Sequence, residues 1–163
     1  MNVLPTIQRL NELFDYDSYT GKFKWKKIPK GQTNQFAGSL HPDGYIYIKI
    51  DQRRYPAHRL AWKILYGHDP ETYLDHIDGN RENNRIDNLR LASIHDNNGN
   101  SAIPKHNTSG YKGVTWHKKC QKWQAQIGDK YLGLYETPEK AHSAYIAAAT
   151  NHFGQFASDG VRS

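Results

Sequence analysis

The sequence has only one cysteine, Cys120, and no long apolar run. A single cysteine excludes an internal disulfide and, without cysteine neighbours, a thiolate zinc cluster. No apolar stretch approaches the roughly 18 residues that span a bilayer, and the start, MNVLPTIQRLNELF, lacks the hydrophobic core of a signal peptide. We therefore expect a soluble, intracellular and cytoplasmic protein without a membrane partner.

Acidic residues are in the minority. Lysine and arginine number 22 against 16 acids, for a formal net charge of +6 and a pI near 9.3. This excess favours polyanionic partners, with nucleic acid ahead of anionic membranes. A length of 163 residues suits one ordinary domain or two small ones, and we favour two.

The first hundred residues predict short helices and strands. IQRLNELF has helical apolar spacing up to Phe14, and GKFKWKKI alternates as a half-buried strand does. YIYIKI places three isoleucines on one face and leads into a hairpin with QRRYPAH. From Ala57 the pattern becomes helical and stops at Gly67. We expect N-terminal strands over 20–56 that lead into a functional core over 57–100.

The remaining residues predict a second domain. NSAIPKHNTSG has no apolar period, so residues 101–109 are expected to be a linker between domains at 1–100 and 110–158. GYKGVTW, KWQAQIG and KYLGLY predict three antiparallel strands. Thr137 and Pro138 predict the start of one helix, which packs on that sheet. The fold class is therefore predicted to be α+β.

The polar segment between Leu74 and Leu91 carries the candidate chemistry. Asp75 directly precedes His76, so on an extended backbone a metal ligand can lie behind a solvent-facing imidazole. Asn88 follows Asp75 by 13 residues, and Asn97 follows by nine more in a helix capped by Ser93. Hydrolysis of a phosphodiester needs a base, a metal and a grip on phosphate, and this segment offers all three.

The motifs HRLAW, LDHIDGN, NNRIDNLR and HDNNGN together resemble the phage and intron-encoded branch of the HNH endonuclease family. The resemblance implies a ββα-metal fold in which Asp75 and Asn97 bind one divalent ion, magnesium or manganese, through oxygens. It implies that His76 is the general base and that Asn88 holds the loop and orients His76 through its amide. Products would carry 5′ phosphate and 3′ hydroxyl groups.

Several neighbouring residues have two interpretations. His95 is a rival to Asn97 as metal ligand and would favour a nitrogen-binding metal. His58 either braces the site or contacts phosphate, or it is a hydrogen-bonded structural histidine, and we place it outside the catalytic set. Three arginines around the loop could clamp phosphates or simply be solvated: Arg81, Arg85 and Arg90.

Residues 108 to 157 resemble the plant ethylene-response-factor (ERF) domain of the APETALA type, in which a three-stranded sheet enters the major groove of DNA. The positions that match exposed ones in that family are Lys112, Thr115, His117, Gln126 and Tyr131. Lys112 and His117 stand where the plant domain has arginines, so its sequence preference is not transferred. The turn with Lys118, Lys119 and Lys122 is strongly basic. Gln124 and Gln126 are expected to face DNA or, equally, solvent.

These features together predict a metal-dependent DNA endonuclease of phage or mobile-element homing type, which acts on double-stranded DNA as a monomer or transient dimer. One alternative is a DNA-binding regulator with an inert nuclease fold. Another is RNA binding or cleavage, because basic sheets with exposed aromatics also stack unpaired bases.

Overall fold

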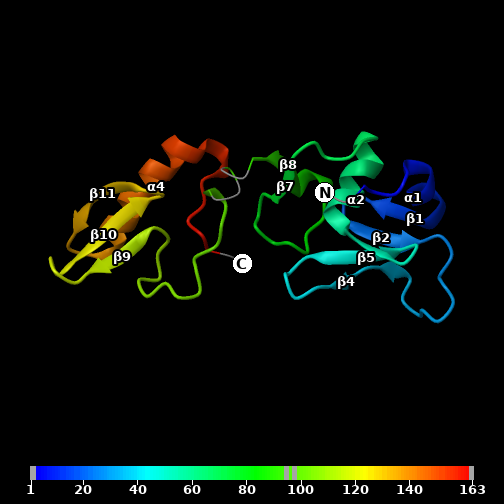
Figure 1. Ribbon diagram of the computed structural model, residues 1–163, viewed down its shortest axis with the longest axis horizontal. Coiled ribbons are helices and arrows are strands. Elements are labelled where there is room, and N and C mark those ends of the chain that lie inside the picture. The colour runs from blue at the N-terminus through cyan, green and yellow to red at the C-terminus, as the bar shows by residue number, and fades with distance from the viewer. Residues whose placement is uncertain (1–2, 94–95, 97–98, 162–163) are drawn as a thin grey trace. The chain divides into compact units, whose positions relative to one another are not determined.

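The computed structural model describes residues 3–93, 96 and 99–161. Their contacts divide the chain into two compact units, one that ends at Ala92 and one that begins at Ser93. Each unit combines helix with small antiparallel sheets, which is compatible with the α+β class (Figure 1). The domain limits given above, with a linker over 101–109, stay a prediction.

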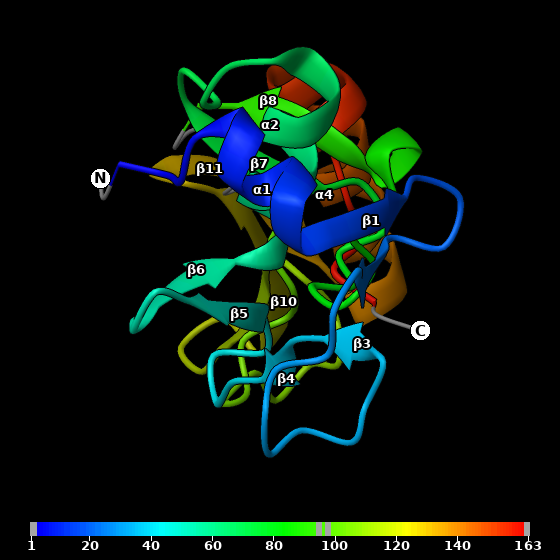
Figure 2. The ribbon, with the colours of Figure 1, turned by 90° about the vertical axis from the view of Figure 1, so that its right-hand side faces the viewer.

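The first unit contains three small antiparallel sheets, in the strand orders β1-β2-β3, β4-β5-β6 and β7-β8. Figure 2 shows the β5–β6 hairpin and the short helix α1. In chain order the described elements are α1 (Ile7–Leu13), β1 (Phe14–Asp17), β2 (Lys22–Trp25), β3 (Phe36–Ala37), β4 (Ser39–Leu40), β5 (Ile46–Ile50), β6 (Arg53–Pro56), α2 (Ala57–Tyr66), β7 (Tyr73–His76), the 3-10 turn η1 (Ile86–Asn88) and β8 (Leu89–Ala92).

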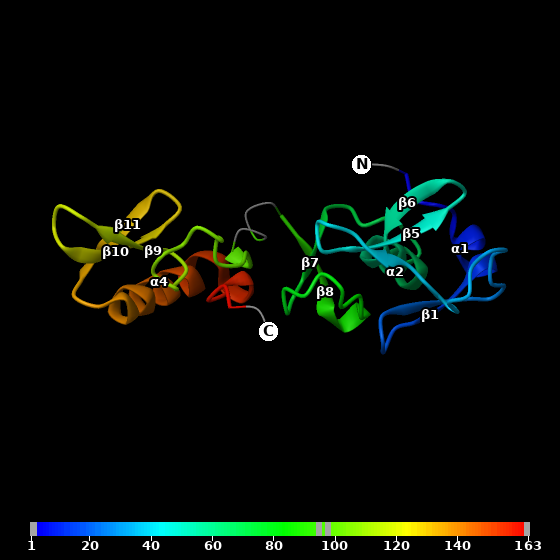
Figure 3. The same ribbon diagram turned by 90° about the horizontal axis from the view of Figure 1, so that it is seen from below.

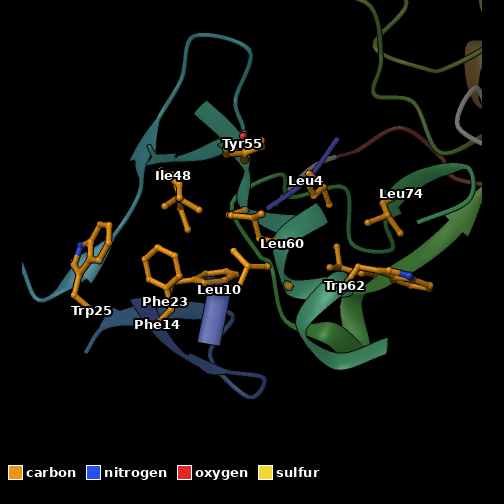
Figure 4. Close-up of a cluster of buried hydrophobic side chains, with 14 residues drawn as sticks. Leu4, Leu10, Phe14, Phe23, Trp25, Ile48, Tyr55, Leu60, Trp62 and Leu74 are labelled. Carbon is orange, nitrogen blue, oxygen red and sulfur yellow. The ribbon is translucent and has the colours of Figure 1, made fainter. Parts of the chain in front are cut away.

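The core of the first unit gathers the apolar faces that the sequence pattern predicts. Phe23 of β2, Ile48 of β5 and Leu60 of α2 are each almost fully buried, and Figure 4 shows them converging with Leu10. Phe14 packs edge-on to Phe23, with ring centroids 5.7 Å apart. The strand and helix patterns over these elements are therefore confirmed. Helix α1 ends at Leu13, and the chain continues directly as strand β1 from Phe14.

The second unit is one sheet with one long helix. The sheet has the strand order β11-β10-β9, and α4 packs along it (Figure 3). Thr137 caps α4, as predicted, by accepting a hydrogen bond from the Lys140 amide at 3.3 Å. The elements are β9 (Val114–His117), β10 (Lys122–Ile127), β11 (Lys130–Tyr135), α4 (Pro138–Phe153) and the 3-10 turn η2 (Gly154–Phe156).

Gly113 lies where the chain enters β9 and has a left-handed φ of +71°. A Cβ there would overlap the ring of Tyr145 and approach the Gln126 carbonyl to 2.8 Å. We expect Gly113→Ala to destabilise the protein by about 2 to 4 kcal/mol, from left-handed strain plus overpacking. The control is Gly110→Ala, at φ +76° with open space around it, which should cost only about 1 kcal/mol. Equal urea midpoints for the two variants would contradict this.

Candidate functional site

The β7–β8 hairpin positions the candidate residues. Its register pairs Asp75 with Arg90 and His76 with Leu89. Side chains alternate along β7, so Leu74 and His76 share one face, which is buried, and Asp75 lies on the other. Leu74 packs into the core of the first unit near Trp62 (Figure 4). This anchors the strand and fixes which way the acid and the imidazole point.

Asp75 is held by the arginine opposite it. Its Oδ2 accepts hydrogen bonds from Arg90 Nε at 2.9 Å and Arg90 Nη2 at 2.8 Å. Both side chains are largely buried, at 11% and 15% exposed. Charge-assisted bonds of this kind fix the carboxylate orientation more firmly than a surface ion pair would. Arg90 was expected either to clamp phosphate or to be solvated, and the structure places its guanidinium on Asp75.

The loop after β7 is built around Asp78 and Asn88. Asn88 Oδ1 accepts from the Asp78 amide at 3.0 Å, and its Nδ2 donates to Asp78 Oδ1 and to the Asn83 carbonyl, both at 2.9 Å. Asp78 Oδ2 also accepts from Asn83 Nδ2 at 2.7 Å. These hydrogen bonds keep the pKa of Asp78 below its usual value although partial burial opposes the shift. Asn88 thus closes the loop over 78–88 with its side chain.

Among the described residues, Asn84 is a hydrogen-bonding partner that orients His76. His76 Nε2 lies 3.3 Å from Asn84 Oδ1, and Asn84 Nδ2 donates to the Glu82 carbonyl at 3.1 Å. The latter bond fixes which end of the amide faces His76, because a carbonyl accepts only from the NH2 group. A neutral His76 therefore carries its proton on Nε2 and its basic lone pair on Nδ1.

Asn88 was predicted to orient His76 through its amide. Among the described residues the Asn88 amide bonds to Asp78 and Asn83, so that part of the prediction is wrong. The physical reason is the short 3-10 turn at Ile86–Asn88, which brings the Asn88 side chain back to the start of the loop.

Asn84 is itself fixed by the first sheet. Asn84 is only 2% exposed, and its backbone carbonyl accepts a hydrogen bond from the Tyr16 hydroxyl at 2.7 Å. Gly21, in the β1–β2 turn with φ +70°, lies against the Asn84–Arg85 peptide, where a Cβ would come within 2.5 Å of the Arg85 nitrogen. Glycine at this turn permits the close approach. The sheet β1-β2-β3 thereby supports the imidazole of His76 from behind.

His76 was predicted to face solvent, and this is wrong for the structure, where it is 3% exposed. Its ring packs edge-on to His58, with centroids 5.2 Å apart, and lies 5.8 Å from Tyr45. The Arg81 guanidinium covers Tyr45 at 4.8 Å and donates to the Asp43 carbonyl at 2.7 Å. The physical reason is strand alternation, since His76 shares the buried face with Leu74. Burial lowers the pKa of His76, which favours the neutral base.

His58, on α2, is buried beside His76. Nδ1 of His58 has no hydrogen-bond partner among the described residues, so the hydrogen-bonded structural role is not supported through that atom. Burial first, and then the charges of His76 and Arg59, lower the pKa of His58 to about 3.

The buried His58 should make the protein acid-sensitive. Between about pH 6.5 and 3 the unfolded state binds a proton at His58 that the folded state excludes. The contribution of neutral His58 to the free energy of unfolding is therefore fully present above about pH 6.5 and is lost as the pH is lowered. At pH 5.5 the loss is about 1.4 kcal/mol. His58→Phe keeps the ring and should remove this loss, which urea midpoints at pH 7.5 and 5.5 would measure. His106→Gln, at an exposed site, is the control; an unchanged acid loss in His58→Phe would refute the assignment.

The metal ligands predicted from sequence can be followed only in part. Asn97 and its rival His95 lie outside the described residues. Within the described part of the chain no group of three His, Cys, Asp or Glu side chains forms a metal site. One carboxylate with one carboxamide needs no such group, because Mg2+ keeps several waters and takes few protein oxygens. The hard, oriented oxygens of Asp75 fit such an ion.

The helix predicted to follow Ser93 is only partly described. The Ser93 hydroxyl accepts a hydrogen bond from the Asp96 amide at 3.2 Å, and the Ser93 amide donates to Asp96 Oδ2 at 2.9 Å. This is the reciprocal contact of an N-cap residue with a side chain three positions later.

The predicted DNA contacts differ in exposure. Arg85 is 40% exposed, although it pairs with Asp87 at 2.7 Å. In the second unit Lys112 was predicted to be exposed, and this is wrong: it is 6% exposed, and its ammonium donates to the Gly99 carbonyl at 2.8 Å. The physical reason is that the strand begins only at Val114, after the left-handed Gly113. The positions that are exposed or half-buried are Thr115, His117, Lys118, Lys119, Lys122, Gln124, Gln126 and Tyr131.

Comparison with known proteins shows what the first unit's site is similar to. Residues 55–98 match the family model described as HNH endonuclease, which spans α2 and the β7–β8 hairpin. This stretch is therefore similar to HNH endonucleases, and the match agrees with that part of the resemblance. Within the described residues no helix is both long and apolar enough to cross a membrane.

Two curated proteins are similar to parts of the chain. Protein 3.8 of Escherichia phage T7 is 44% identical over 71 residues, which cover 43% of this chain and 59% of that protein. The AP2-like ethylene-responsive transcription factor CRL5 of Oryza sativa subsp. japonica is 44% identical over 52 residues, 28% of this chain and 8% of that protein. The chain thus spans less than two thirds of either relative. No solved structure matches.

Proposed function

We propose that this chain is a metal-dependent endonuclease that hydrolyses phosphodiester bonds in double-stranded DNA. The observation that supports this best is the placement of Asp75 and His76 on opposite faces of one strand within the HNH endonuclease domain. Similarity to a phage protein supports a phage or mobile-element homing enzyme that acts inside a host cell, as a monomer or transient dimer.

In the proposed mechanism Asp75 and Asn97 would hold one divalent ion, Mg2+ or Mn2+, while Arg90 orients the Asp75 carboxylate. When bound, the ion supplies stabilisation of the charge on phosphate and on the departing 3′ oxygen. His76 takes a proton from the attacking water at Nδ1, while its Nε2–H stays hydrogen-bonded to Asn84 Oδ1. The water oxygen bonds to phosphorus as the bond between phosphorus and the 3′ oxygen breaks, and the departing 3′ oxygen takes a proton from solvent, which yields 5′ phosphate and 3′ hydroxyl ends.

The low exposure of His76 requires a rearrangement on binding. Arg81 covers Tyr45, whose ring borders His76, and its charge acts on the imidazole. In the proposal a DNA phosphate draws Arg81 off Tyr45 and gives water access to Nδ1, because a guanidinium binds phosphate more strongly than it binds a carbonyl. Arg85 and the lysines of the second unit would contact further phosphates.

A DNA-binding regulator is the second candidate. Two observations favour it: His76 is 3% exposed, and Arg90 already occupies one oxygen of Asp75. Both arrangements suit a nuclease domain that has kept its fold but no longer cleaves DNA. In that case the ERF-like second unit would make the contacts with DNA.

Supercoiled plasmid distinguishes the two candidates. Wild-type protein with Mg2+ should convert it to nicked or linear DNA that DNA ligase reseals, because ligase requires 5′ phosphate and 3′ hydroxyl ends. Excess chelator should abolish conversion. Intact plasmid in both conditions, from protein that still retards duplex DNA in a gel, would establish the regulator and reject the nuclease.

A further inference from the structure

The outer face of the second unit's sheet carries a central pair of glutamines. Trp123, Ala125 and Ile127 of β10 face α4, so Gln124 and Gln126 face outward. Gln124 is flanked by Thr115 on β9 and Leu134 on β11, and Gln126 lies opposite Tyr131. The pair therefore lies on the middle strand of the sheet, where a ligand bound to this face would contact it.

The two glutamine amides are hydrogen-bonded to each other. Gln124 Nε2 donates to Gln126 Oε1 at 2.8 Å. A primary amide has two N–H donors and two carbonyl lone pairs, so one mutual bond leaves each side chain with at least one donor and one acceptor. This holds whichever glutamine is the donor. The mutual bond also restrains two flexible side chains before any ligand binds, which lowers the entropy lost on binding.

We propose that the Gln124–Gln126 pair reads adenine in the major groove of duplex DNA, an inference that rests on the proposed DNA-binding function. Adenine presents the N7 acceptor beside the N6 amino donor, which one amide edge matches with its N–H and its carbonyl oxygen. Guanine presents two acceptors, N7 and O6, so it would set O6 against the amide oxygen. The pair thus favours A·T over G·C base pairs where it inserts.

The surroundings of the pair suit the same base pair. The methyl group of Thr115 and the side chain of Leu134 flank Gln124, and apolar groups of this kind contact the C5-methyl of thymine. The three strands contain no arginine, the side chain that most often reads guanine. The face therefore offers partners for both bases of an A·T pair.

Charge favours duplex DNA as the occupant. Residues 101–163 contain eight Lys or Arg against four acids, and Lys118 and Lys119 are exposed in the β9–β10 turn at one end of the face. Such a turn can hold phosphates that border a groove while the sheet reads base edges. Single-stranded RNA would instead use the ring of Tyr131, which is 58% exposed and lies opposite Gln126 on this face, as a stacking surface.

The test selects ligands from a randomised duplex library with the full chain in excess chelator, so that nothing is cut. The wild type should enrich sites with at least one fixed A·T position. Replacing the selected adenine by 7-deazaadenine, which lacks the N7 acceptor, should then weaken binding by about 5- to 150-fold, the range of one bidentate base contact. The variants Gln124→Leu and Gln126→Leu should each bind the adenine duplex more weakly than the wild type does. Each should bind the adenine duplex and the 7-deazaadenine duplex with equal affinity. Gln32→Leu, at an exposed loop position of the first unit, should behave as wild type.

An unenriched pool, enrichment of G·C alone, or tighter binding to single-stranded RNA than to duplex would overturn the proposal. Equal affinity of the wild type for the adenine duplex and the 7-deazaadenine duplex would also overturn it. That measurement does not depend on the folding of any variant. Plasmid cleavage by Mg2+-loaded protein is scored separately. Cleavage without A·T preference rejects this inference alone, and A·T-selective binding without cleavage rejects the nuclease alone.

Discussion

Replacing His76 by alanine should lower the rate of plasmid cleavage by about 100- to 10,000-fold, the usual contribution of a positioned general base. The reason is that Nδ1 of His76 is the proposed proton acceptor for the attacking water, while Nε2 is committed to Asn84 at 3.3 Å. Binding of duplex DNA in chelator should change by less than about threefold, because a neutral buried imidazole adds little to phosphate attraction. Initial rates of loss of supercoiled DNA measure the first effect, and fluorescence anisotropy the second.

Two further variants separate chemistry from folding. His76→Gln keeps most of the side-chain volume in this buried position and should be as inactive as the alanine variant. His68→Ala, at an exposed position between α2 and β7, should cleave as wild type does. If His76→Gln retained more than a tenth of the wild-type rate, His76 would not be the base.

The strands and helices were predictable because local pattern and core burial agree. Phe23 and Trp25 alternate with lysines, and the structure buries both rings. Thr137 and Pro138 begin α4 as the sequence indicates. These positions are set by periodicity and end signals within one segment, which a sequence displays directly.

The faces of β7 could not be assigned from Asp75 and His76 alone. Alternation separates two neighbouring side chains but does not say which of them turns inward. Leu74 decides it, since it packs in the core near Trp62 and carries His76 to the same side (Figure 4). An apolar residue two positions before a polar one is thus the signal that was overlooked.

Lys112 was misplaced for a different reason. The run GYKGVTW reads as one strand, but Gly113 adopts φ +71° and interrupts it. The ammonium then finds the Gly99 carbonyl, 13 positions earlier in the chain, a contact that no local pattern encodes. Buried lysines depend on such long-range acceptors, so exposure is the natural expectation from sequence.

Asn84 is the site residue that the sequence analysis missed, and Asn84→Leu should lower the cleavage rate by about 10- to 100-fold, comparable to the loss of a supporting residue behind a metal ligand. The near-isosteric change removes the acceptor for His76 Nε2–H and the donor to the Glu82 carbonyl, while Tyr16 still bonds the backbone at position 84. The imidazole then loses the contact that sets its tautomer, so kcat should fall while KM for plasmid stays within about threefold.

The matched control for Asn84→Leu is Asn80→Leu, in the same loop. Asn80 is exposed, and its side-chain Oδ1 accepts a hydrogen bond from the Glu82 amide at 3.1 Å. Asn84→Asp adds a discriminating result: an ionised carboxylate at this position would raise the pKa of His76 and move the acid limb of the pH–rate profile upward. A Leu variant with wild-type kcat, or an Asp variant with an unmoved acid limb, would show that Asn84 supports the loop but does not orient the base.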